Sequence, residues 1–199
     1  MKKQSLSFMI FLMTCFVIIS LGIAGCTSQA PAASKTSTIE PSEIILQPSE
    51  IPVNFTLLEK GERNVSDMSE WSLDHGWKKG YYAVFLNNDP NAIPGTVIEQ
   101  YISVYTAENI TLIVPDTVSG WKNWTVEEND ANLSFEELSL PAIGDSSAAM
   151  KVTNTSDMSQ MYSVSFTKKD VYQQFMTNGT ATDYETVKQL AGIAAAKIK

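Results

Sequence analysis

The sequence predicts an α+β fold, in which an antiparallel sheet is packed by a C-terminal amphipathic helix and one further helix. Two observations lead to this prediction. Residues 182–199 carry apolar side chains at helical spacing. Between residues 80 and 176, five segments are rich in the Tyr, Val, Ile and Phe residues that favour strands. Five strands with only two helices favour an antiparallel sheet with helices packed on it.

Two strands and a helix are expected first. The segments "GYYAVFLN" (80–87) and "TVIEQYISVY" (96–105) are dense in β-forming residues, and "NNDPNAIPG" between them is typical of a loop. A helix that begins at Thr106 is expected next, although Pro115 weakens its pattern. Its apolar positions are Ile110, Ile113, Val114, Val118 and Trp121.

Three further strands are expected after this helix. The segment "AIGDSSAAMKVT" (142–153) predicts a strand that opens at a Gly-Asp turn. Residues 161–179, "MYSVSFTKKDVYQQFMTNG", predict a hairpin that turns at "TKKD".

The final helix has the clearest pattern in the sequence. Thr182 and Glu185 are predicted to form a capping box at its first turn. The small side chains of its apolar stripe should let it lie close to the strand that carries Tyr162, Val164 and Phe166. The stripe consists of Val187, Leu190, Ala191, Ala194, Ala195 and Ile198.

Residues 1–25 are expected to be a signal peptide. Two lysines precede the almost wholly apolar run "FMIFLMTCFVIISLGI" (8–23). The run ends in Ile23-Ala24-Gly25-Cys26, which resembles the lipobox of prokaryotic lipoproteins. We therefore expect a lipid on Cys26, with the cell membrane as partner and the chain on its extracytoplasmic face. The alternative is a retained transmembrane helix, which tethers the chain in the same way.

Residues 26–50 are expected to be a lipid-anchored linker, and residues 51–199 a single α+β extracytoplasmic domain. Pro, Ser, Thr and Ala dominate residues 27–50, and such a composition buries too little apolar surface to fold alone. Removal of the signal leaves Cys26 as the only cysteine, so no intramolecular disulfide is available. The domain must therefore be stable through its core.

The exported chain is strongly acidic. Loss of Lys2 and Lys3 leaves 12 basic residues against 22 acidic ones, which gives a net charge of −10. This charge argues against nucleic acid as a partner, because the phosphate backbone is itself negative. Arg63 is the only arginine, so a site built on a cluster of arginines is excluded.

Asparagine sequons are unusually frequent. Seven of the 11 asparagines stand in N-x-S/T sequons, and turn preferences of Asn, Ser and Thr explain only a part of this excess. We therefore expect a glycoprotein, and a lipobox together with dense sequons indicates an archaeal surface protein. The candidate sites are Asn54, Asn64, Asn109, Asn123, Asn132, Asn154 and Asn178.

The sequence contains no recognisable catalytic set, and we expect neither an enzyme nor a cofactor or metal site. His75 is the only histidine, and its turn-like context predicts an exposed or locally bonded ring. Zinc sites need several His or Cys ligands. The acidic segments "EEND" (127–130) and "FEEL" (135–138) lack the spacing of a calcium loop and are expected to be solvated loops.

Tryptophans provide the candidate binding residues. Trp121 and Trp124 in "GWKNWT" have helical spacing and flank the sequon at Asn123. Indole rings stack on sugar faces or anchor protein interfaces. Packing at the rim of a small core is the alternative, and a glycan on Asn123 would crowd a pocket there.

Four segments of the chain resemble a group of archaeal, methanogen-type surface lipoproteins with a small α+β extracytoplasmic domain. The order of "GDSS", strand, hairpin and "QLA" helix is also similar to small extracytoplasmic domains of lipoproteins and sensor kinases. The resemblance supplies no catalytic residues. Its segments are "GWKKGYYAVF" (76–85), "IEQYISVYTAENI" (98–110), "LPAIGDSSAAMKV" (140–152) and "DYETVKQLAGIAAAKI" (183–198).

Three functions remain open from the sequence. The first is a non-enzymatic domain that binds a small ligand or an envelope component, a protein or a glycan. The second is a structural or protective glycosylated envelope protein, and the third is a carboxylate-based hydrolase. A formed apolar pocket would favour the first, a solid core the second, and two carboxyls about 5–9 Å apart in a cleft the third.

Mass spectrometry of the protein from its native host tests the anchor and the glycans together. Cys26→Ser should abolish lipid attachment and leave an unprocessed precursor, because no other thiol follows the small residues of the lipobox. The mass of the wild-type protein should exceed that of lipidated polypeptide by several glycans. Normal processing of Cys26→Ser would contradict the lipid site at Cys26. A wild-type mass without glycans would contradict the predicted glycosylation.

Overall fold

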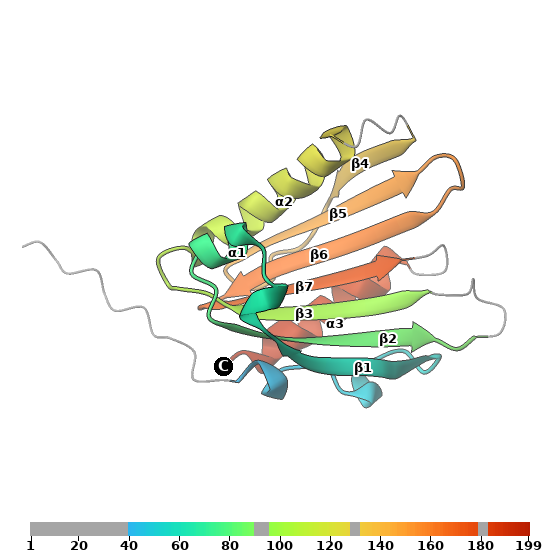
Figure 1. The fold of residues 1–199 in the computed structure, drawn as a ribbon. Helices are drawn as coiled ribbons and strands as arrows, with labels where there is room; N and C mark the ends of the chain where they lie inside the picture. Colours follow the sequence, from blue (N-terminus) through green and yellow to red (C-terminus); the bar gives the residue numbers. More distant parts are fainter. Residues whose placement is uncertain (1–39, 90–95, 128–131, 179–182) are drawn as a thin grey trace, which may run out of the picture. The chain divides into compact units, whose positions relative to one another are not determined.

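The computed structural model describes residues 40–89, 96–127, 132–178 and 183–199, which belong to one compact unit of the chain. They form a seven-stranded antiparallel sheet with the strand order β1-β2-β3-β7-β6-β5-β4 (Figure 1). The pair of β3 and β7 joins the first three strands to the last four. The expected α+β fold, with a C-terminal helix and a further helix on an antiparallel sheet, is confirmed.

Three elements of this fold are absent from the sequence-based expectation, namely β1, β4 and α1. The strands are β1 (Phe55–Arg63), β2 (Lys79–Asn87), β3 (Val97–Val104), β4 (Leu133–Leu138), β5 (Ser146–Asn154), β6 (Gln160–Lys168) and β7 (Val171–Asn178). The α-helices are α1 (Glu70–Asp74), α2 (Ile110–Glu127) and α3 (Tyr184–Lys197). Short 3₁₀ turns are η1 (Pro41–Glu43), η2 (Pro48–Glu50) and η3 (Val65–Asp67). The segment "FEEL" therefore belongs to strand β4, not to a loop.

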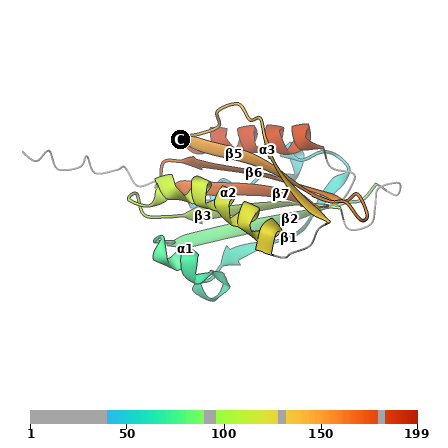
Figure 2. The ribbon, with the colours of Figure 1, turned by 90° about the horizontal axis from the view of Figure 1, so that it is seen from above.

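Helices cover the sheet on both faces, α3 on one and α1 with α2 on the other (Figure 2). Side chains alternate along a strand, so each central strand contributes to both layers. In β3, Ile98 and Ile102 belong to the core under α3, whereas Tyr101 and Ser103 point to the face of α2. The α3 face carries the main apolar core, and its largest fully buried side chains are Phe85, Phe166 and Phe175.

Helix α3 packs through its predicted stripe. All six stripe residues are buried, and Val164 and Phe166 lie in the same core. The ring of Tyr184 stacks on that of Tyr162 with 6.0 Å between centroids. The cap differs from the expected one, because the side chain of Asp183 accepts the Thr186 N–H at 2.6 Å. Thr182, the expected cap, lies outside the described residues.

Residues 40–51 form a strap that packs into the core beside α3, so the predicted domain boundary at residue 51 is wrong. The side chains of Ile44, Ile45 and Leu46 are at most 3% exposed, and Ile51 is also buried. The strap lies next to the C-terminal end of α3 in Figure 1. A run of three aliphatic residues thus gives this Pro- and Ser-rich segment enough apolar surface to join the fold.

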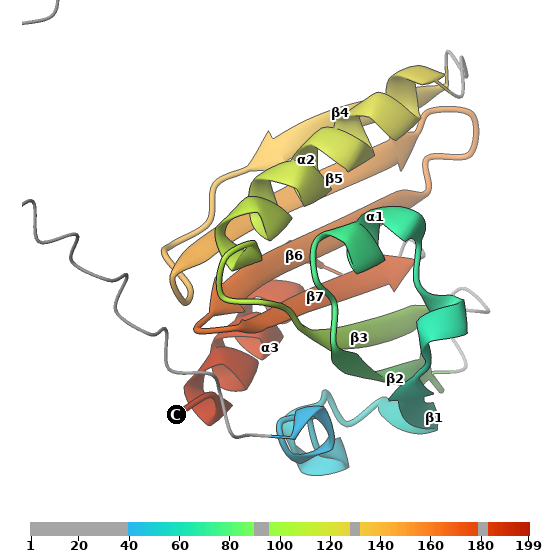
Figure 3. The same cartoon turned by 60° about the vertical axis from the view of Figure 1, so that its left-hand side comes forward.

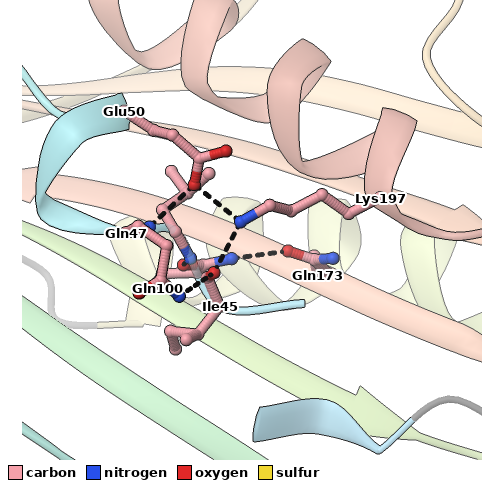
Figure 4. Close-up of polar contacts among 7 residues, drawn as sticks. Ile45, Gln47, Glu50, Gln100, Gln173 and Lys197 are labelled. Carbon is pink, nitrogen blue, oxygen red and sulfur yellow. Dashed lines mark hydrogen bonds and ion pairs between the residues drawn. The ribbon is translucent and has the colours of Figure 1, made fainter. Parts of the chain in front are cut away.

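Polar contacts fix the strap to the sheet and to α3 (Figure 4). The backbone N–H of Leu46 donates to Gln100 Oε1 at 2.9 Å, and Gln100 Nε2 donates to Gln173 Oε1 at 2.8 Å. From α3, Lys197 Nζ donates to the Ile45 carbonyl at 2.7 Å and pairs with Glu50 Oε2 at 2.6 Å. Both glutamines are fully buried, so the strap supplies a partner that Gln100 needs.

Ile45→Ala in the full chain should lower the free energy of unfolding by about 2–5 kcal/mol, the usual cost of emptying a buried aliphatic site. Glu43→Ala, at an exposed position of the same strap, should leave stability almost unchanged. Chemical denaturation measures both variants. Equal stability of the two variants would mean that the strap is not part of the core.

Candidate functional site

A cleft of about 770 Å³ lies on the sheet face opposite α3. Figure 3 shows α1 and α2 on that face, with α2 along β5 and the strands β6 and β7 passing between the two helices. Helix α2 forms one wall, and α1 together with the end of β1 forms the other. The floor comes from alternate residues of the three strands: Tyr101 and Ser103 of β3, Tyr172, Gln174 and Met176 of β7, and Met161 of β6.

Helix α2 is the aromatic wall. It begins at Ile110, whose N–H donates to the Thr106 carbonyl at 3.2 Å, and it continues through Pro115 to Glu127. The Trp121 and Trp124 rings meet edge to face with 5.7 Å between centroids, and both line the cleft. Gly120 also lines it, and a Cβ there would have no atom within 4 Å. The helix therefore carries two indoles beside an open space.

The chain's only histidine links the short helix α1 to α2. The ring of His75 stacks on Trp71 at 4.2 Å between centroids, and its Nδ1 lies 2.8 Å from the Trp71 carbonyl. A carbonyl only accepts, so Nδ1 is the donor in this contact. The other nitrogen, Nε2, lies 3.4 Å from Asp116 Oδ2 on α2. His75 thus fixes the indole of Trp71 in the second wall and connects the two walls.

Arg63 reaches the cleft floor from the edge strand β1. The register aligns Arg63 with Gly80 of β2 and Gly80 with Ser103 of β3. A Cβ on Gly80 would lie 3.3 Å from the Cδ atom of Arg63, so the absent side chain leaves room for the arginine stem. Arg63 Nη1 donates to Ser103 Oγ at 3.2 Å, and the guanidinium lies 5.2 Å from the centroid of the Tyr101 ring.

Three tyrosines supply neutral hydroxyl groups to the cleft. Burial raises the pKa of Tyr101 to about 12, with a further contribution from the Glu99 carboxylate that accepts its hydroxyl at 2.9 Å. Burial also raises the pKa of Tyr172 to about 12 and the pKa of Tyr105. The hydroxyl of Tyr172 lies 3.2 Å from Thr117 Oγ1 on α2. These phenols therefore stay protonated at neutral pH and act as hydrogen-bond donors.

The structure places both predicted binding residues, Trp121 and Trp124, in the cleft lining. It adds cleft residues that the sequence analysis did not single out for binding, and the most important are Arg63, Tyr101 and Met176. These residues come from strands far apart in the chain, so only the strand register brings them together. A sequence signal existed for Arg63 alone, as the only arginine in the chain.

The remaining predicted sites lie outside the cleft lining. None of the seven sequon asparagines is buried, and Asn54, Asn64, Asn123, Asn132 and Asn178 are exposed. Cys26, the expected lipid site, lies outside the described residues. Across the described ranges, no three His, Cys, Asp or Glu side chains are grouped as a metal site. Within the same ranges, none of the helices has the length and hydropathy needed to cross a bilayer.

Comparison with known proteins identifies a shared fold. No protein-family model matches the chain, and no curated protein matches it. Among solved structures, the chain is similar to the extracellular domain of PknH from Mycobacterium tuberculosis, with a TM-score of 0.60 and 12% identity. The match covers 84% of this chain and 96% of that chain. At this identity the likeness concerns the fold alone.

Tyrosine ionisation offers a test of the buried floor. An unfolded tyrosine has a pKa of about 10, so between pH 10 and 12 the unfolded chain releases protons that folded Tyr172 retains. The free energy of unfolding should therefore fall by about 1.4 kcal/mol per pH unit for Tyr172 in this window. In a pH titration of tyrosinate absorbance, the exposed tyrosines should ionise near pH 10 and the buried ones in a later step near pH 12. The amplitude of the later step should be smaller by one tyrosine in Tyr172→Phe than in the wild type. A decrease in the amplitude of the earlier step instead would contradict the burial of Tyr172.

Proposed function

We propose that the protein is a membrane-anchored surface lipoprotein whose extracytoplasmic domain binds a small ligand in the cleft between α1 and α2. The cleft carries this proposal. Its volume, about 770 Å³, is within the range of small-molecule sites, and its lining combines aromatic rings with a few convergent polar groups. On their other face the same strands are covered by the packed core under α3, so the cleft and that core lie on opposite faces of the sheet.

The proposed location rests on the lipobox that ends at Cys26 and on the surface positions of the sequons. The structural neighbour is itself an extracellular domain, which agrees with an extracytoplasmic place for this fold. The segments that resemble archaeal surface lipoproteins support the same place. In this proposal the lipid on Cys26 holds the chain at the membrane, and the folded domain faces the outside.

Binding rather than catalysis is supported by the chemistry of the cleft. Asp116 is the only carboxylate among its described lining residues, so this lining lacks the carboxylate pair of a glycoside hydrolase. Both ring nitrogens of His75 are engaged, one by the Trp71 carbonyl and the other by Asp116. The hydroxyls of Ser69 and Ser72 lie 3.0 Å from each other, and no hydrogen bond joins His75 to a cleft serine among the described residues. Glu136 of β4 pairs with Lys151 at 2.5 Å and is not a lining residue.

A structural or protective role in the envelope is the second candidate, and the distribution of the sequons favours it. Accessible asparagines occur on β7, on α2 and in the loops before β1 and β4, so glycans at all seven sites would cover several sides of the domain. Asn123 stands between the two cleft tryptophans in the sequence, and a glycan there would lie at the cleft rim. This role and ligand binding are compatible in one protein.

The neutral fluorescent probe N-phenyl-1-naphthylamine tests the cleft directly. It should bind the wild-type domain saturably at one site. Gly120→Phe should weaken this binding about tenfold or more, because a ring in the open space removes roughly 60 Å² of probe contact, worth about 1.5 kcal/mol. Helix α2 should remain intact, since Phe favours a helix more than Gly does.

Gly192→Phe is the matched control. Gly192 is an exposed glycine of α3, where a Cβ would likewise have no atom within 4 Å, and it lies on the opposite side of the sheet. The binding constant of this variant for the probe should equal that of the wild type. Absence of saturable binding by the wild type, or equal weakening in both variants, would overturn the proposed function.

A further inference from the structure

The cleft changes from polar to apolar along its length. Ser103 of β3 pairs with Tyr172 of β7, and these residues form the polar end together with Arg63. Four residues further along β3, Glu99 pairs with Met176, and this step corresponds to about 13 Å. Two residues beyond Glu99, Val97 of β3 pairs with Asn178 of β7. Asn178 in turn pairs with Met161 of β6, so Met161 lies about 20 Å along the strands from Ser103. The tryptophans of α2 line the cleft together with these methionines.

The polar end contains a cation without an acidic partner. Among the described residues, Arg63 forms no ion pair, and its guanidinium donates only to Ser103 Oγ. A guanidinium has five N–H donors, so most of them remain for water or a ligand. Ser103 Oγ also accepts the Trp77 indole N–H at 3.2 Å, which holds this hydroxyl in place. The Tyr101 ring and the gap at Gly80 further fix the direction of the arginine.

Two carboxylates near this end are already engaged. Asp116, the carboxylate of the lining, faces His75, and Glu99 accepts the hydroxyl of Tyr101. The single arginine of a chain with 22 acidic residues is thus directed into a cleft instead of into a surface ion pair. Arginine binds carboxylates through two parallel hydrogen bonds, which selects for this geometry.

We infer that the ligand is an elongated amphipathic organic acid, with its carboxylate at Arg63 and its apolar body along Met176, Met161 and the tryptophans of α2. This inference rests on the proposed binding function and names the class of ligand. The ring of Tyr101 holds the guanidinium of Arg63 beside the acid group, and the flexible methionines accommodate an apolar chain. The apolar end lies about 13–20 Å from Ser103, which suits an extended chain better than a compact metabolite.

Decanoate and decanamide test this inference, because they have the same chain and nearly the same shape and differ in charge. Each competes with N-phenyl-1-naphthylamine on the full chain. In the wild type, decanoate should displace the probe at a concentration about tenfold lower than decanamide does, as a charge-assisted contact predicts. The ratio of the displacing concentration of decanamide to that of decanoate should fall to about one in Arg63→Gln. It should be intermediate in Arg63→Lys, because lysine keeps the charge but cannot form two parallel hydrogen bonds to a carboxylate.

Lys60→Gln is the matched control, because it removes the same charge from the same strand. Lys60 is exposed and aligns with Ala83, a residue of the α3 core, so it points away from the cleft. The ratio of displacing concentrations in Lys60→Gln should equal that of the wild type. Structural damage in Arg63→Gln would weaken the binding of decanoate and of decanamide alike, so it would leave their ratio unchanged.

The outcomes separate this inference from the proposed function. A wild-type ratio of one, or an unchanged ratio in Arg63→Gln, would overturn the organic-acid ligand while probe binding still supports the cleft as a site. Loss of probe binding in the wild type would overturn both. The soluble headgroup glycerol phosphate, added in place of decanoate, should not displace the probe. Displacement by glycerol phosphate would mean that a phosphate headgroup is bound instead of an organic acid with an apolar chain.

Discussion

The fold depends on one sheet that must be covered on both faces. All neighbouring strands are antiparallel, and the central strands β3, β7 and β6 are buried between helices on the two sides. Because side chains alternate, each of these strands supplies an apolar row to one layer and a mixed row to the other. Val164 and Phe166 of β6 are fully buried under α3, whereas Ser163 and Ser165 face α2. The cleft is a consequence of this division.

Stability is concentrated on the α3 face. There the strap, α3 and six strands pack together, and buried Gln100 connects the strap backbone to Gln173 on β7. The described residues contain no cysteine, so no disulfide shares this role within them. A rigid layer behind the sheet leaves the other face free to carry a cleft, since the residues of the floor are fixed by strands whose opposite sides are tightly packed.

Elements with a strong periodic pattern could be predicted from the sequence, and edge elements could not. The hairpin of β6 and β7 and the stripe of α3 have buried faces and therefore clear alternation or helical spacing. The edge strands β1 and β4 bury few residues, and β1 also shifts register between Leu57 and Glu59. The packing of the strap could not be predicted, because its Pro- and Ser-rich composition is typical of a linker. Trp121 and Trp124 could be found because they are helical neighbours, whereas Arg63 and Tyr101 meet only through strand pairing.

Small residues keep the cleft open. Gly80 leaves space for the Arg63 stem, Gly120 leaves space on α2, and Ser103 provides only a hydroxyl where a larger side chain would fill the floor. On the α3 face, the same strands carry phenylalanine and isoleucine that leave no comparable room. Filling the cleft with aliphatic side chains would add apolar burial, at about 25 cal/mol per Å², and so stabilise the domain. A domain that instead holds a solitary arginine over a hydroxyl floor forgoes that stabilisation, and the proposed ligand would account for the difference.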